Sequence, residues 1–192
     1  VLMSDNNDLI KRLMIQDASF LTAHEKSLLQ NNLDSFNRLA VMSNSELSSI
    51  IQRDVTRSLW NGSEVLKKAQ TALRLIKALG IKWTFIDSPD FPPMLREMKD
   101  PPYALFYRGN LDCLNQKCVS IVGTRRVTCT GRNAAFDFAK DASDDNVTVV
   151  SGLAMGVDIC SHKGALAGKS GKTAAVLPGG IDTIVPLSNT KT

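Results

Sequence analysis

The chain has 192 residues, a mass of 20.9 kDa and a formal net charge of +4. Hydrophobic residues make up 43% of it and charged residues 22%, which excludes global disorder and a collagen-like structure. No apolar run approaches the roughly 18 residues that a transmembrane helix needs, and the start lacks the features of a signal peptide. We expect no membrane association, and we expect a fragment because the chain does not begin with Met. The mild basicity permits an acidic partner such as nucleic acid without requiring one.

The first 82 residues are predicted to form about five short helices. Segments 22–25 and 43–46 both have the Ser/Thr-x-x-Glu pattern of a capping box, in which the two side chains satisfy amides at a helix start. A longer helix is predicted to be capped by Ser63, and Gly80 is expected to end it in a left-handed conformation. We therefore expect a small all-helical domain over residues 1–82.

One face of that longer helix carries Lys67, Arg74 and Lys77. These three side chains could form an ordinary solvated face or a nucleic-acid contact, and the pattern by itself leaves both interpretations open.

The composition changes near residue 83, since ten of the twelve glycines and all seven prolines follow this point. Apolar strands are predicted at four places: 103–107, 118–122, 147–150 and 173–177. Helices are expected between the last three, at about 132–142 and 157–166. Apolar strands that alternate with helices indicate an α/β fold, a doubly wound Rossmann-like parallel sheet over residues 83–192.

Four cysteines have no Cys-x-x-Cys spacing: Cys113, Cys118, Cys129 and Cys160. This indicates reduced thiols, used as small core residues, in a cytoplasmic protein. With His24 and His162 as its two histidines, the chain is not expected to bind zinc, and we predict no cofactor.

Three of the predicted strands end in glycine-rich turns, at 123–126, 151–156 and 178–180. Because the carboxyl ends of parallel strands share one edge of a sheet, these turns should meet at a ligand crevice. Glycine allows backbone amides to approach a phosphate, and Arg125 and Arg126 could grip it. The alternative is that each glycine serves only a tight turn.

Two better-known phosphate motifs are absent. No Gly-x-Gly-x-x-Gly follows the 118–122 strand, and segment 168–173 precedes a strand where a Walker A motif precedes a helix. We interpret 168–173 as a polar loop.

Asp158 and His162 are four residues apart and could form a hydrogen-bonded pair that fixes the helix start, contacts a ligand or acts in catalysis.

The second part of the chain resembles the DNA-processing protein A family, also called DprA or Smf. Four segments are similar to motifs of this family and occur in the same order: 91–110, 119–131, 149–166 and 174–189. The resemblance implies a cytoplasmic bacterial protein that is not an enzyme and that binds single-stranded DNA during natural transformation. It also implies that the protein helps to load the RecA recombinase and can form a homodimer.

Carried over by motif position, the resemblance implies these DNA-contacting residues: Gly123, Arg125, Ser151, Gly152, Asn189 and Lys191. It implies a scaffold or pocket-wall role for five others: Gly156, Asp158, His162, Gly179 and Gly180. Two departures are Thr130 and Val185, which stand where the family usually has tyrosine, so two aromatic side chains that could stack on bases are missing. We expect the family's sheet to continue past residue 192, so the dimer and RecA surfaces need not lie within this chain.

Two other functions stay open. One is a nucleoside-monophosphate hydrolase of the lysine-decarboxylase-like group, which also uses a Pro-Gly-Gly turn but follows it with Gly-Thr and a glutamate. Here residues 181–183 read Ile-Asp-Thr, and no glutamate follows Glu97. The other is a nucleotide-sensing domain that binds a small phosphorylated ligand.

Overall fold

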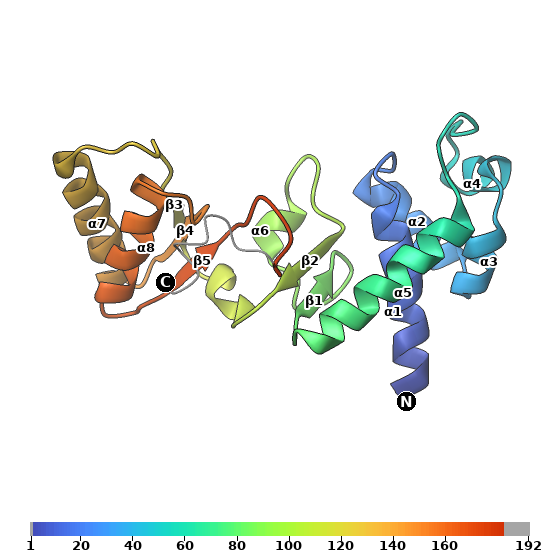
Figure 1. Ribbon diagram of the computed structural model, residues 1–192, viewed down its shortest axis with the longest axis horizontal. Helices are drawn as coiled ribbons and strands as arrows, with labels where there is room; N and C mark the ends of the chain where they lie inside the picture. Colours follow the sequence, from blue (N-terminus) through green and yellow to red (C-terminus); the bar gives the residue numbers. More distant parts are fainter. Residues whose placement is uncertain (1, 183–192) are drawn as a thin grey trace. The chain divides into compact units, whose positions relative to one another are not determined.

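The computed structural model describes residues 2–182, and its first part is helical, as predicted (Figure 1). Five α-helices follow one another: α1 (Leu2–Asp17), α2 (Ala23–Asn32), α3 (Phe36–Val41), α4 (Asn44–Ile51) and α5 (Gly62–Ala78). Gly80 follows α5 with a φ of 60°, which confirms the predicted left-handed stop.

Both predicted capping boxes are present. The Glu25 amide donates to Thr22 Oγ1 over 3.3 Å, and the Thr22 amide donates to Glu25 Oε2 over 2.8 Å. Segment 43–46 forms the same pair of bonds at the start of α4. The cap predicted for α5 is wrong, because the helix starts at Gly62 with Asn61 as its cap, and the Asn61 side chain accepts from the Glu64 amide.

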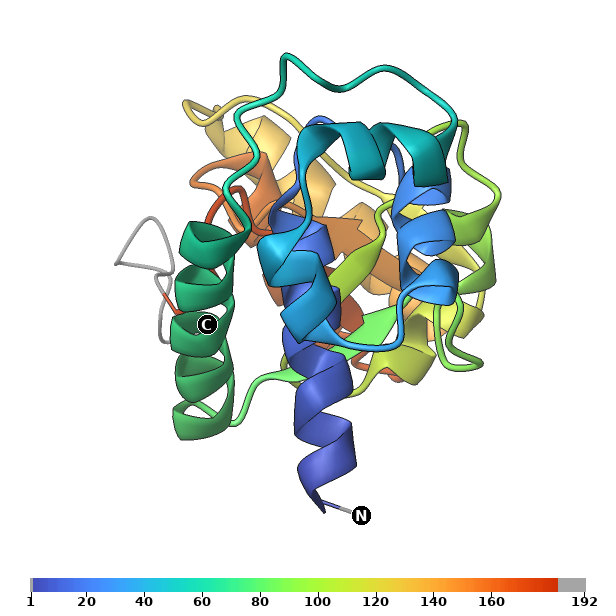
Figure 2. The ribbon, with the colours of Figure 1, turned by 90° about the vertical axis from the view of Figure 1, so that its right-hand side faces the viewer.

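The core of this helical part is formed by apolar side chains from all five helices. Met14, Ile15, Leu29, Leu39 and Leu47 are fully buried. Helix α5 packs against α1 and α3, and Figure 2 shows α1 and α5 side by side. A helix of this length is stabilised mainly by burying such an apolar stripe, since isolated short helices are marginal in water.

The helices are followed by a two-stranded antiparallel sheet and a short helix. These elements are β1 (Lys82–Phe85), α6 (Pro93–Arg96) and β2 (Ala104–Tyr107). The predicted strand at 103–107 is therefore present, but it pairs with β1, a strand that sequence reasoning missed, in the register Lys82↔Tyr107.

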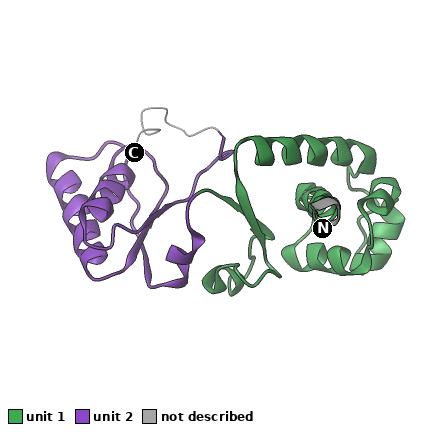
Figure 3. Ribbon diagram, turned by 90° about the horizontal axis from the view of Figure 1, so that it is seen from below, with its two compact units in different colours: residues 1–108 green, residues 109–192 purple. Residues whose placement is uncertain are grey.

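The chain divides into two compact units, and the sheet of β1 and β2 belongs to the first. Unit 1 is Val1–Arg108 and unit 2 is Gly109–Thr192 (Figure 3). This division differs from the predicted boundary between residues 82 and 83, because contacts with the helices hold the sheet in unit 1.

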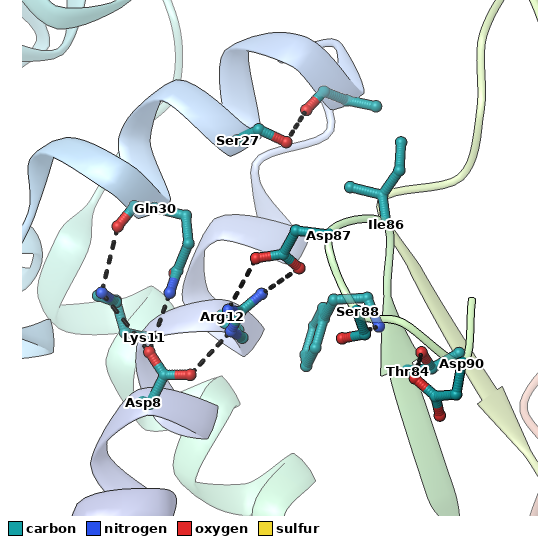
Figure 4. Close-up of polar contacts among 12 residues, drawn as sticks. Asp8, Lys11, Arg12, Ser27, Gln30, Thr84, Ile86, Asp87, Ser88 and Asp90 are labelled. Carbon is teal, nitrogen blue, oxygen red and sulfur yellow. Dashed lines mark hydrogen bonds and ion pairs between the residues drawn. The ribbon is translucent and has the colours of Figure 1, made fainter. Parts of the chain in front are cut away.

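Arg12 on α1 makes the main polar contact between the helices and the turn that follows β1. Its guanidinium donates to both carboxylate oxygens of Asp87 over 2.8 and 2.9 Å, and also to Asp8 over 2.8 Å (Figure 4). It lies 4.7 Å from the centre of the Phe85 ring. A bidentate pair of this kind fixes two elements relative to each other more firmly than a single ion pair.

Unit 2 is built around a parallel sheet. Its elements are a 3₁₀ helix η1 (Leu111–Asn115), β3 (Cys118–Ser120), α7 (Cys129–Asp144), β4 (Thr148–Ser151), α8 (Val157–Ala167) and β5 (Thr173–Ala175). The strand order is β3-β4-β5, and both strand pairs are parallel. The predicted α/β fold with a Rossmann-like sheet behind a helical part is confirmed.

Helices α7 and α8 pack against each other and against one face of this sheet. Ala139 of α7, Val149 of β4 and Ala165 of α8 form the buried cluster, with Val119 and Ile121 beside it. These small side chains let the two helices lie close to the sheet, and the strand ends are thereby held rigidly.

The four cysteines are unpaired thiols. Cys118 and Cys129 are exposed, so the expectation that all four are core residues is wrong for these two.

Segment 168–173 leads into β5, which agrees with its interpretation as a loop. Between residues 2 and 182, no helix is both long and apolar enough to cross a membrane.

Candidate functional site

The carboxyl ends of β3, β4 and β5 lie along one edge of the sheet, as the sequence predicted. Parallel pairing requires this, because all three strands run in the same direction. The segments that leave this edge are 121–128, 152–156 and 176–180, which contain the three glycine-rich turns. Ligands of open α/β sheets bind at such an edge.

The first two turns are in direct contact. The Val157 amide donates to the Thr124 carbonyl over 3.2 Å. A Cβ on Gly156 would lie 2.1 Å from the same carbonyl oxygen, and a Cβ on Gly123 would lie 2.7 Å from a methyl group of Val157. The turns therefore approach each other this closely only because neither glycine has a side chain.

Gly152 and Asp158 link the end of β4 to the start of α8. The Gly152 amide donates to Asp158 Oδ2 over 3.1 Å, and the carboxylate is buried. The neighbouring Ser151 hydroxyl donates to the Ile121 carbonyl over 2.6 Å and is also buried. Asp158 thus fixes the helix start, while Ser151 joins β4 to the segment after β3.

His162 does not pair with Asp158, so one predicted interaction is absent. Its Nδ1 lies 2.7 Å from Thr173 Oγ1, and that hydroxyl donates to the Val149 carbonyl over 2.8 Å. Because the hydroxyl proton is used there, His162 Nδ1 must donate and Nε2 is unprotonated. Burial lowers the pKa of His162, so the ring is held neutral in the structure.

Arg125 and Arg126 lie in the turn after β3 and are both exposed. Neither forms an ion pair with the residues that the structure describes. The Arg126 amide donates to Thr124 Oγ1 over 3.1 Å, which tightens the turn. Two exposed guanidinium groups with no ion-pair partner among the described residues can bind an anion at this turn.

The remaining predicted site residues fall into two groups. Gly179 and Gly180 are exposed in the turn after β5. Asn189 and Lys191 lie outside the described residues. The structure therefore brings six of the predicted residues together around the ends of β3 and β4 and the start of α8: Gly123, Arg125, Ser151, Gly152, Gly156 and Asp158. His162 lies farther along α8 and bonds to Thr173, the first residue of β5.

Sequence reasoning missed the backbone conformation of the turn between β4 and α8. Leu153 has a φ of 55° and Gly156 a φ of 87°, and left-handed backbone is unusual for leucine. Such strain is concentrated at binding and active sites. Nothing in the residue type of Leu153 could have indicated it, because leucine normally avoids this region.

The described part of the chain contains no group of three or more His, Cys, Asp or Glu side chains that could hold a metal ion. The polar groups of the edge include the two exposed arginines and the internally bonded Asp158. This arrangement can bind an anion.

Taken together, a largely helical unit and a Rossmann-like unit whose glycine-rich turns meet at one sheet edge define the class of protein. The model of a family described as DNA recombination-mediator protein A matches residues 82–192. The chain belongs to this family.

Several curated proteins are similar to the chain over part of their length. Protein Smf of Borreliella burgdorferi is 30% identical over 95% of this chain and 57% of its own length. DNA processing protein DprA of Bacillus subtilis is 33% identical over 64% of this chain and 41% of its own length. The chain thus spans about half of these relatives.

A solved structure is also similar to the whole fold. DNA processing protein A (DprA) of Streptococcus pneumoniae matches 95% of this chain and 62% of its own chain, with a TM-score of 0.66 and 25% identity. This likeness extends over both units and supports the combination of a helical part with a Rossmann-like part.

Proposed function

We propose that the chain binds single-stranded DNA at the carboxyl edge of the sheet in unit 2. The observation that carries this proposal is the junction of two glycine turns, where the Val157 amide meets the Thr124 carbonyl beside the unpaired Arg125. A phosphate group suits this place because the forked, exposed guanidinium of Arg125 can bind it with two hydrogen bonds.

Helix α8 adds to the attraction. It has 11 residues, and its first turn lies against the turn that carries Arg125. The positive end of the helix dipole favours negative charge there, and the buried Asp158 carboxylate in the first turn already supplies part of it. The exposed side chains of this junction are Thr124, the two arginines and the apolar Val122 and Met155. The arginines suit a phosphate backbone, and no aromatic ring is present for stacking on bases.

The proposed function does not include catalysis. Two side chains could transfer protons, Asp158 at this edge and His162 farther along α8. Asp158 is bound to the Gly152 amide and His162 to Thr173, and both are buried. Their hydrogen bonds support a role as scaffold for the turns.

In the cell we propose a cytoplasmic role in natural transformation, in which the bound strand is passed to the RecA recombinase. Family membership and the relatives named DNA processing protein support this role. RecA loading is tested by the rate of ATP hydrolysis by RecA on a single strand covered with single-strand-binding protein. Addition of the chain should raise that rate, and an unchanged rate would contradict loading by this chain.

The test of DNA binding compares Arg125→Ala with Arg126→Ala, using fluorescence anisotropy of a labelled single strand. Arg125→Ala should weaken binding by about 1–3 kcal/mol, the usual range for a charge-assisted contact, and Arg126→Ala should weaken it less. Both side chains are exposed, so the melting temperature should barely change.

A duplex of the same sequence and a salt titration complete the test. The parent should prefer the single strand, with a log–log salt slope of roughly −0.7 for each phosphate neutralised. Tighter binding to duplex, or a slope near zero, would refute the proposal. Parent-like affinity of Arg125→Ala would show that the site lies elsewhere.

A further inference from the structure

Helix α5 in unit 1 has a face that no part of the proposed function uses. Five side chains form a row along it, all exposed and separated alternately by four and three residues: Ser63, Lys67, Gln70, Arg74 and Lys77. We call these five residues the donor row, because each side chain carries a hydrogen-bond donor. The alternating spacing places them on one side of the helix.

The opposite side of α5 is the one that packs. Val65, Ala69 and Ile76 are buried there, and the helix contacts α1 and α3. The donor row therefore points away from the core of unit 1, and Figure 2 shows α5 at the margin of the helical cluster, beside α1.

The donor row carries three positive charges and no carboxylate. The acidic residue of α5, Glu64, lies to one side, 4.0 Å from Lys68. Lys68 Nζ also lies 3.6 Å from a carboxylate oxygen of Asp17. Lys68, whose charge these two carboxylates neutralise, is not part of the donor row.

The three cations of the donor row are not neutralised by a described carboxylate. Lys67 and Arg74 form no ion pair with the side chains that the structure describes, those of residues 6–182. Lys77 Nζ donates to the neutral Asn6 side chain over 2.7 Å. Opposite charges four residues apart stabilise a helix, and this row contains no such pair.

We propose that the donor row binds the phosphate backbone of the same single strand that unit 2 binds, as a second contact. The row covers 14 steps of the helix, about 21 Å at about 1.5 Å per residue, which suits an extended, flexible polyanion. It contains no aromatic side chain for stacking on bases, so its contact is to phosphate alone. This inference rests on the proposed function.

The experiment compares two triple variants of the whole chain. The test variant is K67Q/R74Q/K77Q, which removes the charges of the row and keeps hydrogen-bond donors. The control is R38Q/R57Q/K99Q, which removes three exposed charges of unit 1 outside α5. The probe is a labelled single strand of about 40 nucleotides, longer than the roughly 4–16 nucleotides that one binding module covers.

The test variant should bind this strand about tenfold more weakly than the control at low salt. Its log–log salt slope should be smaller by about 2, since three lost contacts contribute roughly 0.7 each. Both variants should melt like the parent. Equal affinities of test variant and control would overturn the inference.

Arg125→Ala in the same assay separates this inference from the proposed function. If Arg125→Ala weakens binding and the test variant does not, the donor row is refuted and the site in unit 2 stands. If the test variant weakens binding and Arg125→Ala does not, the donor row is supported and the site in unit 2 is refuted.

Discussion

Replacement of Gly156 by alanine tests the junction of turns without removing any charge. The new Cβ would lie 2.1 Å from the Thr124 carbonyl oxygen and 2.8 Å from Arg125 Cα. An ordinary contact needs more than 3 Å, so the backbone at Thr124 and Arg125 would have to move by about 1 Å. Because Arg125 is the proposed anchor for phosphate, this shift should weaken DNA binding.

The free energy of unfolding of Gly156→Ala should be lower than that of the parent for two reasons. Gly156 has φ 87° and ψ −126°, a region in which other residues are strained by about 1–3 kcal/mol. The shift also breaks the bond from the Val157 amide to the Thr124 carbonyl, worth about 1 kcal/mol. The sum is about 2–4 kcal/mol, or a drop in the melting temperature of unit 2 on the order of 10–20 °C.

Gly171→Ala is the matched control. Gly171 has a φ of 61° but no atom within 4 Å of the position of its Cβ, so alanine there adds strain without a clash. It should destabilise by about 1–2 kcal/mol and leave DNA binding unchanged. Calorimetry gives the stabilities, and anisotropy well below both melting temperatures gives the affinities. Parent-like affinity of Gly156→Ala would refute the reasoning, and so would equal stability of the two variants.

Limited proteolysis should first cut the parent near residues 108–110, where one unit ends along the chain and the other begins. The Asp87→Ala variant should gain a second cleavage site at 86–92, because this substitution removes the ion-pair partner of Arg12. An unchanged cleavage pattern of this variant would contradict the role of that ion pair. Arg53 holds the pKa of Glu25 at about 2, so this pair should stabilise unit 1 above about pH 4.5 and lose its effect as the pH falls toward 2. Acid titration of the melting temperature should show unfolding of Arg53→Ala at higher pH than the parent. His162 is held neutral with a lowered pKa, so unit 2 should lose stability as the pH falls below about 6.5, where the unfolded chain takes up a proton first. The His162→Gln variant should show a flatter pH profile between 7 and 5, values that bracket this ordinary histidine pKa.

The amino-acid sequence by itself determined the local elements and their order. The capping boxes at 22–25 and 43–46 and the helix stop at Gly80 could be predicted because their hydrogen bonds join residues only a few positions apart. The alternation of apolar strands and helices after residue 110 predicted the parallel sheet and hence the common edge of the glycine turns.

Only the tertiary structure decided which partners meet. The spacing in the sequence suggested a hydrogen bond between His162 and Asp158, which are four residues apart. In the structure His162 bonds to Thr173 on β5, and Asp158 accepts a hydrogen bond from the Gly152 amide. Strand 104–107 likewise joins β1 rather than the parallel sheet. These outcomes depend on how elements pack after they form, since a buried polar group bonds to whichever partner the fold brings within reach, and spacing along the chain does not specify that partner.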